Sequence, residues 1–510
     1  MFLISLMLAF LLAGFVVLIA MPADLRKNRI VAAFFSAVPL ILGVYMLFSF
    51  NYGNPAYQFS EHYTWISTAY FRISYAVGVD GIALPMVFLT VLVSFLVVLF
   101  SWDVGHRSNQ YFSMILLVEA GVLGVFTTLN YFIFYIFWEL VLVPMYFVIL
   151  IWGSEKRVYS ATKFFIYTHA SSLVMLLSFF ALYFEYHSMF PGRPFTFSIT
   201  RIAQVSPLFP HFFQIIVFFG LMFGFIVKMP VFPFHTWLPD AHTDAPTGGS
   251  VMLASLLLKM GSYGLIRIAV PTLPYGAKYF EYLIVVLAVI SILYGAWVSM
   301  AQKDLKRMIA NSSISHMGLV LLAIAAAIFT LNPKTGYINP IGITVADFQM
   351  FAHGLITAVL FMSAGVIQHH AGTRDMDRLG GLARRMPTLA TLMMGGFLAS
   401  LGMPGMVGFA AEFSVFYVTY LSFGLLLIIP IFTVVITAGY YIWSMQRSIF
   451  GKDSAEIEMG NVHDSNWYES LPMAILIVII VAFGVLPWFM FNPISMSVIH
   501  YYSLMAGALK

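Results

Sequence analysis

The chain has 510 residues, of which 61% are hydrophobic and 9% are charged, whereas soluble domains carry about 25% charged residues, so we predict a polytopic membrane protein. Because it contains no cysteine, disulfides and cysteine-ligated zinc or iron–sulfur clusters are excluded, and the sequence has no phosphate-loop or dinucleotide-binding glycine motif. The net charge of +4 comes from basic residues in short loops between apolar runs, which excludes a concentrated basic patch for nucleic acid.

A helix needs about 20 apolar residues to cross a bilayer, and this criterion predicts about fourteen transmembrane helices in an all-α fold. They lie near residues 1–21, 30–50, 79–101, 111–127, 129–152, 162–186, 211–229, 248–270, 277–298, 306–330, 344–369, 387–420 (interrupted), 424–448 and 470–492. The first run lacks a preceding basic segment, so we predict a retained helix rather than a secretory signal. The boundary at Thr127-Thr-Leu-Asn130 is the least distinct. No stretch is long enough for a second domain, so residues 1–510 form one membrane domain.

Lysine and arginine residues in the predicted loops alternate between two sides of the membrane. One side carries 16 of them: Arg26, Lys27, Arg29, Arg107, Lys156, Arg157, Lys163, Lys303, Lys306, Arg307, Arg374, Arg378, Arg384, Arg385, Arg447 and Lys452. The other side carries seven: Arg72, Arg193, Arg201, Arg267, Lys278, Lys334 and Lys510. The positive-inside rule predicts that the first set faces the cytoplasm and that both termini lie outside.

Two of the predicted spans are broken by proline. The seventh ends at Lys228-Met-Pro230, and the twelfth is interrupted at Gly402-Met-Pro-Gly405 before it resumes toward Glu412. Interrupted helices at corresponding places in two halves of a chain indicate inverted repeats around an ion site at the bilayer midplane. We therefore expect helices 1–3 (residues 1–110), two inverted five-helix repeats (spans 4–8, residues 111–270, and spans 9–13, residues 277–448) and a last helix (470–492).

Six ionisable side chains from six spans lie near one depth, judged from the helix rise of about 1.5 Å per residue. They are Glu139, Lys228, Lys259, His316, His353 and Glu412. A charge at the bilayer centre costs about 2.5–3.5 kcal/mol on insertion scales, so a row of such groups favours a proton relay over a static scaffold. Because a nearby carboxylate favours the charged form of a buried lysine, Glu139 is predicted to control whether Lys228 holds or releases a proton.

Other readings of these polar residues remain open. Glu139 and Lys228 can be a structural ion pair, and Glu119 and His169 can be polar contacts between helices rather than relay groups. The linker residues His235, Asp240, His242 and Asp244 resemble metal ligands by composition. Packing at the helix break or access of water accounts for them better, so we predict no metal site.

The sequence resembles the antiporter-like subunits of respiratory complex I in four segments that contain these residues. The segments are Phe137-Trp-Glu139-Leu, the block from Lys228-Met-Pro through His-Thr-Trp-Leu-Pro-Asp-Ala-His to Ala-Pro, Leu258-Lys259-Met-Gly, and Ser313-Ile-Ser-His316-Met-Gly. Within this family it is most similar to the chain M branch. In Gly408-Phe-Ala-Ala-Glu412-Phe it has a glutamate where chains L and N and the Mrp-type subunits typically carry lysine.

The resemblance implies a proton-translocating subunit of a bacterial NADH:quinone oxidoreductase in the inner (cytoplasmic) membrane, which moves protons outward beside chains L and N. It implies that Glu139 modulates Lys228, that Lys259 is the central relay, and that His316 and His353 lead to Glu412. NADH, FMN, iron–sulfur clusters and quinone would belong to partner subunits, with no cofactor or redox centre in this chain. The alternatives are a subunit of an Mrp-type cation/proton antiporter and the antiporter-like chain of a membrane-bound hydrogenase or formate-linked complex.

Overall fold

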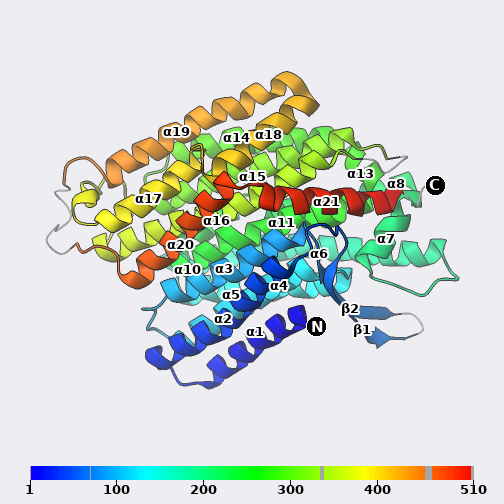
Figure 1. Cartoon of the computed structure of the whole chain (residues 1–510), viewed down its shortest axis with the longest axis horizontal. Coiled ribbons are helices and arrows are strands. Elements are labelled where there is room, and N and C mark those ends of the chain that lie inside the picture. The colour runs from blue at the N-terminus through cyan, green and yellow to red at the C-terminus, as the bar shows by residue number, and fades with distance from the viewer. Residues whose placement is uncertain (1, 69–70, 334–337, 454–461, 507–510) are drawn as a thin grey trace.

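The computed structural model describes residues 2–68, 71–333, 338–453 and 462–506, except for the side chains of 504–506, and shows a bundle of long helices lying side by side (Figure 1). The first half contains α1 (Leu3–Ala20), α2 (Leu25–Ser49), α3 (Ala83–Phe100), α4 (Ser108–Thr127), α5 (Tyr131–Trp152), α6 (Arg157–Met189) and α8 (His211–Lys228). The second half contains α14 (Glu281–Met300), α15 (Leu305–Thr330), α16 (Pro340–Ala371), α17 (Pro387–Ser400), α18 (Val407–Phe423), α19 (Ile428–Ser448) and α20 (Trp467–Val485). The predicted helical membrane fold is confirmed.

Thirteen helical stretches of the described residues are long and apolar enough to cross a membrane, compared with about fourteen predicted. One of them, Val407–Ser448, has 42 residues, which at about 1.5 Å per residue would be roughly 63 Å, twice the thickness of the hydrocarbon core. It contains two helices, α18 and α19, separated at Gly424, whose φ of 56° favours glycine. The uncertain boundary between spans four and five is also resolved, because the Asn130 side chain accepts the N–H groups of Phe132 and Ile133 and caps α5.

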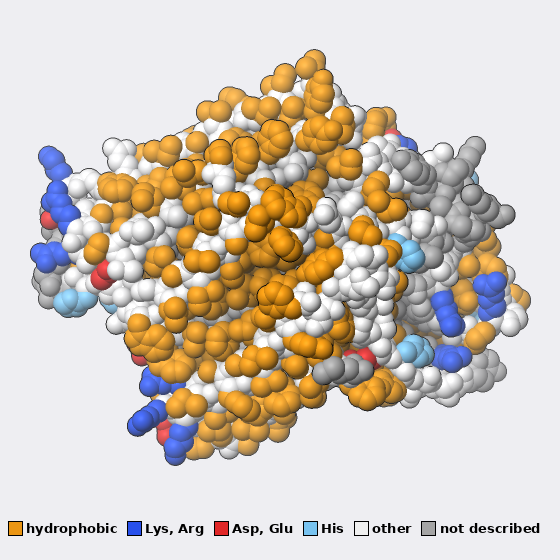
Figure 2. All heavy atoms as spheres, in the orientation of Figure 1, with side chains coloured by type: hydrophobic (Ala, Val, Ile, Leu, Met, Phe, Trp, Pro, Cys, Tyr) orange, Lys and Arg blue, Asp and Glu red, His pale blue; other side chains and the backbone are white. Residues whose placement is uncertain are grey.

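The surface of the bundle agrees with a lipid environment. Hydrophobic side chains cover the middle of the face in Figure 2, whereas Lys and Arg side chains gather toward its ends. Phe48, Leu425 and Phe212 are 82%, 80% and 74% exposed. A soluble monomer tolerates exposed apolar side chains only in small patches.

Two ends of the bundle can be distinguished. We call the end that carries Arg107, Lys303, Arg374 and Arg447 the basic end. Two of its loops contact each other there, through Lys303 and Asp377, 2.8 Å apart, and through Arg374 and Asp304, 3.0 Å apart. Lys334 and Lys510, which entered the predicted charge count for the other side, lie outside the described residues.

The opposite end holds elements that lie mostly outside the predicted spans. An antiparallel hairpin, β1 (Gln58–Ser67) and β2 (Arg72–Val79), lies there (Figure 1), so we call it the hairpin end. It also holds two short helices, α7 (Ile199–Val205) and α13 (Pro274–Tyr279). The last predicted span, 470–492, is wrong at its C-terminal boundary. Helix α20 stops at Val485, before Pro487, and α21 (Trp488–Ala506) follows, because proline cannot continue a helical hydrogen-bond ladder.

Both predicted breaks are confirmed. Helix α8 ends at Lys228, and a turn leads to the short helix α9 (Trp237–Asp244). Helix α17 ends at Ser400, and α18 resumes at Val407 after a turn in which Gly402 and Gly405 have φ values of 72° and 88°. Other residues are strained at such angles, so these two glycines allow the chain to turn between the two half-helices.

The predicted span 248–270 is helical but not regular. It consists of α10 (Thr247–Met252), η2 (Leu253–Leu257), α11 (Leu258–Gly264), η3 (Leu265–Ala269) and α12 (Val270–Thr272), of which η2 and η3 are π-helical. A π turn widens the helix and leaves backbone carbonyls without their usual donors, which is common at functional sites. This irregular helix and α16 form the buried centre of the bundle.

Candidate functional site

Lys259 and His353 lie in direct contact at the centre of the bundle. The Nζ atom of Lys259 on α11 is 2.7 Å from Nδ1 of His353 on α16, and it donates a hydrogen bond of 2.5 Å to the carbonyl of Ala254 in η2. Both side chains are at most 3% exposed. Among the described residues no carboxylate forms an ion pair with Lys259. No permanent anion in contact therefore fixes the positive charge on this lysine.

A second pair continues from His353. The rings of His353 and His316, on α15, have centroids 5.5 Å apart, and Nδ1 of His316 is 3.1 Å from a carboxylate oxygen of Glu412 on α18. His316 and Glu412 are 6% and 7% exposed. Four of the six predicted site residues thus form one line through four helices.

The space between the two pairs can hold a water molecule. A cavity of about 10 Å³ is lined by His316, His353, Gln349 and Glu412, among others, and about that volume accommodates one water. Nε2 of His353 and Oε1 of Gln349 are buried, and neither has a hydrogen-bond partner among the described residues. A water bonded to these atoms would lie beside Glu412, which lines the same cavity.

The other two predicted residues, Glu139 and Lys228, are not in contact. The Glu139 carboxylate accepts a hydrogen bond from Ser172 and lies 3.0 Å from Nδ1 of His169, both on α6. The ammonium of Lys228 lies 4.9 Å from the centre of the Trp138 ring, a distance at which a cation is attracted to the ring face. No ion pair within 4.0 Å joins Glu139 to Lys228 in the described part of the chain.

Lys228 and Lys259 come from helices that touch. A Cβ atom on Gly261 of α11 would lie 2.5 Å from the carbonyl oxygen of Phe225 and 2.8 Å from the amide nitrogen of Met229. Only glycine allows this approach. The close packing of α8 and α11 places the end of α8, with Lys228, beside the helix that carries Lys259, although no described hydrogen bond links the two lysines.

The two aspartates among the linker residues that resemble metal ligands have other partners. Asp240 pairs with Lys163 at 2.7 Å and Arg307 at 3.4 Å. Asp244 accepts hydrogen bonds from Ser154 at 2.7 Å and Ser160 at 2.5 Å. These contacts hold α9 against α6 and α15, as expected of packing at a helix break.

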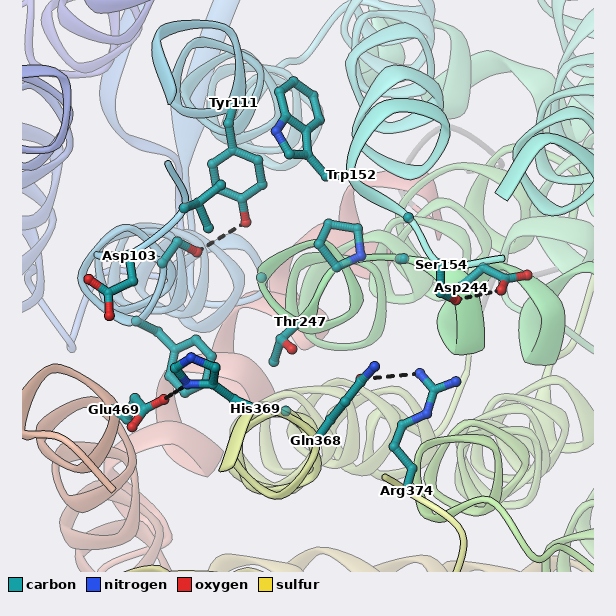
Figure 3. A pocket seen from close by; sticks show the side chains of 18 of the residues that line it. Asp103, Tyr111, Trp152, Ser154, Asp244, Thr247, Gln368, His369, Arg374 and Glu469 are labelled. Atoms are coloured by element: carbon teal, nitrogen blue, oxygen red, sulfur yellow. Dashed lines mark hydrogen bonds and ion pairs between the residues drawn. The ribbon is translucent and has the colours of Figure 1, made fainter. Parts of the chain in front are cut away.

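A cavity of about 560 Å³ opens at the basic end. Figure 3 shows Asp103, His369 and Glu469 on one side of it, and Ser154 and Asp244 on the other. Its inner wall includes Asp244, Ala245 and Pro246, and the Ala245 carbonyl accepts a hydrogen bond from Lys306. Three residues before Ala245, His242 is fully buried, and neither of its ring nitrogens has a partner among the described residues. The cavity thus ends beside the backbone that leads to His242 and that Lys306 contacts.

Three groups at the site were not predicted from sequence. The Arg267 guanidinium donates two hydrogen bonds to Asp80, one of them 2.8 Å long, near the hairpin end. Asp347 on α16 is fully buried with both oxygens unpartnered in the described structure. His369 and His370 each lie 3.0 Å from an oxygen of Glu469 at the basic end. Asp347 is the only acidic residue of the predicted span 344–369, and Arg267 is the second basic residue of the predicted span 248–270. A charged residue inside a predicted span is a signal that sequence reasoning can detect. Both residues lie near the ends of those spans, where charges commonly reach water.

Sequence comparisons identify relatives over nearly the whole chain. Residues 128–437 match the family described as NADH:quinone oxidoreductase/Mrp antiporter, transmembrane. The chain is 43% identical over 456 residues to F(420)H(2) dehydrogenase subunit M of Methanosarcina mazei, covering 89% of this chain and 88% of that protein. It is 37% identical over 472 residues to NADH-quinone oxidoreductase subunit M of Rickettsia bellii, covering 92% and 90%.

Solved structures match the fold over the same length. A chain of respiratory complex I from Thermus thermophilus with bound NADH superposes with a TM-score of 0.84 at 26% identity and covers 99% of both chains. A chain of the Mrp complex from Dietzia sp. also reaches a TM-score of 0.84, at 19% identity and full coverage of both chains.

Proposed function

The chain belongs to the NADH:quinone oxidoreductase/Mrp antiporter transmembrane family, and from this premise we propose that it is the M-type proton-translocating membrane subunit of a quinone-reducing dehydrogenase complex. The observation that carries the proposal is the line of contacts from Lys259 through His353 and His316 to Glu412. Ionisable side chains inside a membrane protein are costly and are retained where ions or protons pass.

The proposed path begins at the basic end, which the positive-inside rule assigns to the cytoplasm, with both termini outside. Water in the large cavity brings protons toward Lys306 and His242. From there they reach Lys259. Glu139 acts on Lys228 through its charge across the space between them rather than by direct contact, and this charge in turn influences whether Lys259 keeps its proton.

The transfer from Lys259 to Glu412 uses ordinary proton chemistry. The ammonium of Lys259 gives a proton to Nδ1 of His353, and Nε2 of the same ring gives its proton to water in the small cavity. The water passes a proton to Glu412 directly or through His316. Each step moves one proton. His353 ends as the tautomer with hydrogen on Nδ1, and it must return to the tautomer with hydrogen on Nε2 before Nδ1 accepts again.

The electron donor and all redox groups belong to partner subunits in this proposal, with chains of the L and N type as neighbours in the cytoplasmic membrane. The relatives named NADH-quinone oxidoreductase subunit M support NADH as the donor to the complex. The higher identity to the F(420)H(2) dehydrogenase subunit supports reduced F420 as a second candidate donor. An Mrp-type antiporter is less favoured, because the Mrp chain matches at 19% identity, against 35–43% for the subunits named M.

The test is to purify the complex from its native membrane through a tag on this chain. It should contain dehydrogenase subunits with flavin and iron–sulfur clusters, oxidise NADH or reduced F420 with a quinone analogue, and acidify the vesicles into which it is inserted. An uncoupler should abolish the acidification but not the oxidation. A complex without redox centres that exchanges Na⁺ for protons would contradict the proposal.

A further inference from the structure

Asp347 is a fully buried carboxyl group with no hydrogen-bond partner at either oxygen in the described structure. It lies on α16, six residues before His353 and toward the hairpin end. Leaving a buried polar group unpaired destabilises the fold, and more so when the group is charged. Such a group in a packed interior therefore needs an explanation.

The charges around Asp347 do not balance it. Arg267 and Asp80 are the charged groups that act on it most strongly, but Arg267 is already occupied. Its guanidinium donates to both oxygens of Asp80, to Tyr57 at 3.1 Å and to Tyr263 at 3.2 Å. Since one arginine neutralises one carboxylate, Asp347 adds a buried negative charge unless it holds a proton or is reached by water.

The position of Asp347 relative to Lys259 is fixed by two helices. Lys259 touches His353, and Asp347 lies six residues from His353, or about 9 Å along α16. Arg267 lies eight residues from Lys259, about 12 Å in the same direction. Asp347 is therefore between the level of Lys259 and the Arg267–Asp80 pair.

Polar groups occupy the interval. The Ser262 hydroxyl, three residues beyond Lys259, is buried and also has no partner among the described residues. Tyr263 contributes a hydroxyl that donates 2.9 Å to the carbonyl of Phe126. The hydroxyl of Ser262 and the carboxyl oxygens of Asp347 have unused hydrogen-bonding capacity, which bridging water molecules can satisfy.

We propose that Asp347 is a second proton acceptor for Lys259, on a branch that leads outward to the Arg267–Asp80 pair and the hairpin end instead of through His353 and His316 to Glu412. This inference rests on the proposed function and assigns it an additional site.

The proton balance of the branch is simple. The Lys259 ammonium gives a proton through water to the Asp347 carboxylate, which leaves a neutral amine and a carboxylic acid. The acid then releases the proton to water beside Asp80, and the carboxylate is restored. The fixed positive charge of Arg267 helps the carboxylate to re-form without itself losing a proton.

The test uses the whole purified complex in proteoliposomes and measures protons translocated per electron pair. Asp347→Asn has nearly the same shape as a protonated Asp347 and cannot carry a proton, so it should assemble and lose the contribution of this branch. Asp347→Glu keeps the proton site and should retain most of the ratio. Thr344→Val, one turn away on α16, removes a buried hydroxyl that bonds only to the helix backbone, and it should match the parent.

A second readout follows the proton itself. In infrared difference spectra, the band of a protonated carboxylic acid that appears during turnover should be missing in Asp347→Asn and present in Thr344→Val. If Asp347→Asn does not assemble, Asp347→Ser makes the same test with a smaller side chain. An assembled Asn or Ser variant with the parent's proton ratio and an unchanged band overturns the assignment. A parent complex that does not pump contradicts the proposed function instead.

Discussion

The Nδ1 atom of His316 lies 3.1 Å from Oε1 of Glu412, which joins α15 to the half-helix that begins after the break at Gly402–Gly405. The contact places the only acidic residue of α18 next to an imidazole that can give it a proton or take one back. Ser400, the last residue of α17 before the break, also lies in the site. Its hydroxyl is 3.5 Å from Nε2 of His316. The helix break thus assembles the end of the line.

Glu412→Gln should keep the hydrogen-bonding shape but remove the proton site. We expect the complex to assemble and proton transfer through this line to fall by about 100-fold or more, the usual effect of losing a positioned acid or base. Glu412→Lys restores a titratable group and should leave measurable pumping. Vesicle acidification driven by electron-donor oxidation provides the measurement, and normal acidification by both Glu412→Gln and Glu412→Ala would show that Glu412 is not in the path.

Glu139→Gln should impair pumping strongly, although Glu139 does not touch Lys228. The reason is that its charge, not its contact, acts on the lysine, so Glu139→Asp should keep part of the activity. His169→Ala removes a direct partner of Glu139 without removing the charge and should have the smaller effect. Equal losses in Glu139→Gln and His169→Ala would indicate that their mutual contact matters and not the carboxylate charge.

Several features of this site could be predicted from sequence because they depend on residues close together in the chain. The break after Lys228 follows from Pro230, and that after Ser400 follows from the Gly402–Gly405 turn. Counting residues from the start of each predicted span also placed Lys259 and His353 at the same depth, although they are far apart in the chain. In the structure their side chains are in contact.

Other features depend on how helices rotate against one another, which spacing along the chain does not reveal. Glu139 has His169 and Ser172 within reach because of the way α5 and α6 face each other. Asp347 was hidden for a related reason. It is near the end of a predicted span, and only the three-dimensional fold shows that neighbouring elements cover it completely.

The loop carboxylate of Asp464 should stabilise the start of α17. It accepts the N–H groups of Thr388 at 2.8 Å and Leu389 at 3.2 Å, which have no acceptor within the helix. Asp464→Ala should raise hydrogen exchange at these two amides by about 2- to 30-fold, corresponding to the roughly 0.5–2 kcal/mol of a helix cap. Asp377→Ala, which removes a loop carboxylate paired with Lys303 and Arg447, is the control and should leave both amides unchanged.

The same cap should depend on pH in one direction. Burial alone raises the pKa of Asp464, but the hydrogen bonds from Thr388, Ser465 and Leu389 outweigh it and hold the pKa below its usual value. Its stabilising effect is therefore complete above about pH 4, the ordinary range of an aspartate, and is lost as the pH falls through the lower folded value. The measurement is the hydrogen-exchange protection of the Thr388 amide, corrected for intrinsic exchange, between pH 5 and about 8. Protection that weakens as the pH rises over this range would contradict the assignment.

His353→Ala should reduce pumping less than Lys259→Ala. The small cavity beside His353 already has room for about one water, and loss of the imidazole enlarges it, so water can replace the ring in part. Nothing comparable replaces the ammonium of Lys259. Initial rates of vesicle acidification for the two variants, each normalised to assembled complex, provide the comparison, and a larger loss in His353→Ala would reverse the order of the two groups.

The central claim is that Lys259 must give up its proton in each cycle, and Lys259→Arg tests it most directly. Arginine keeps the positive charge and a similar length but does not deprotonate in proteins. The measurement is the number of protons translocated per electron pair by the purified complex in proteoliposomes. We predict an assembled complex that has lost the proton translocation carried by this subunit. A Lys259→Arg complex with the parent's proton-to-electron ratio would contradict the claim and remove Lys259 from the path.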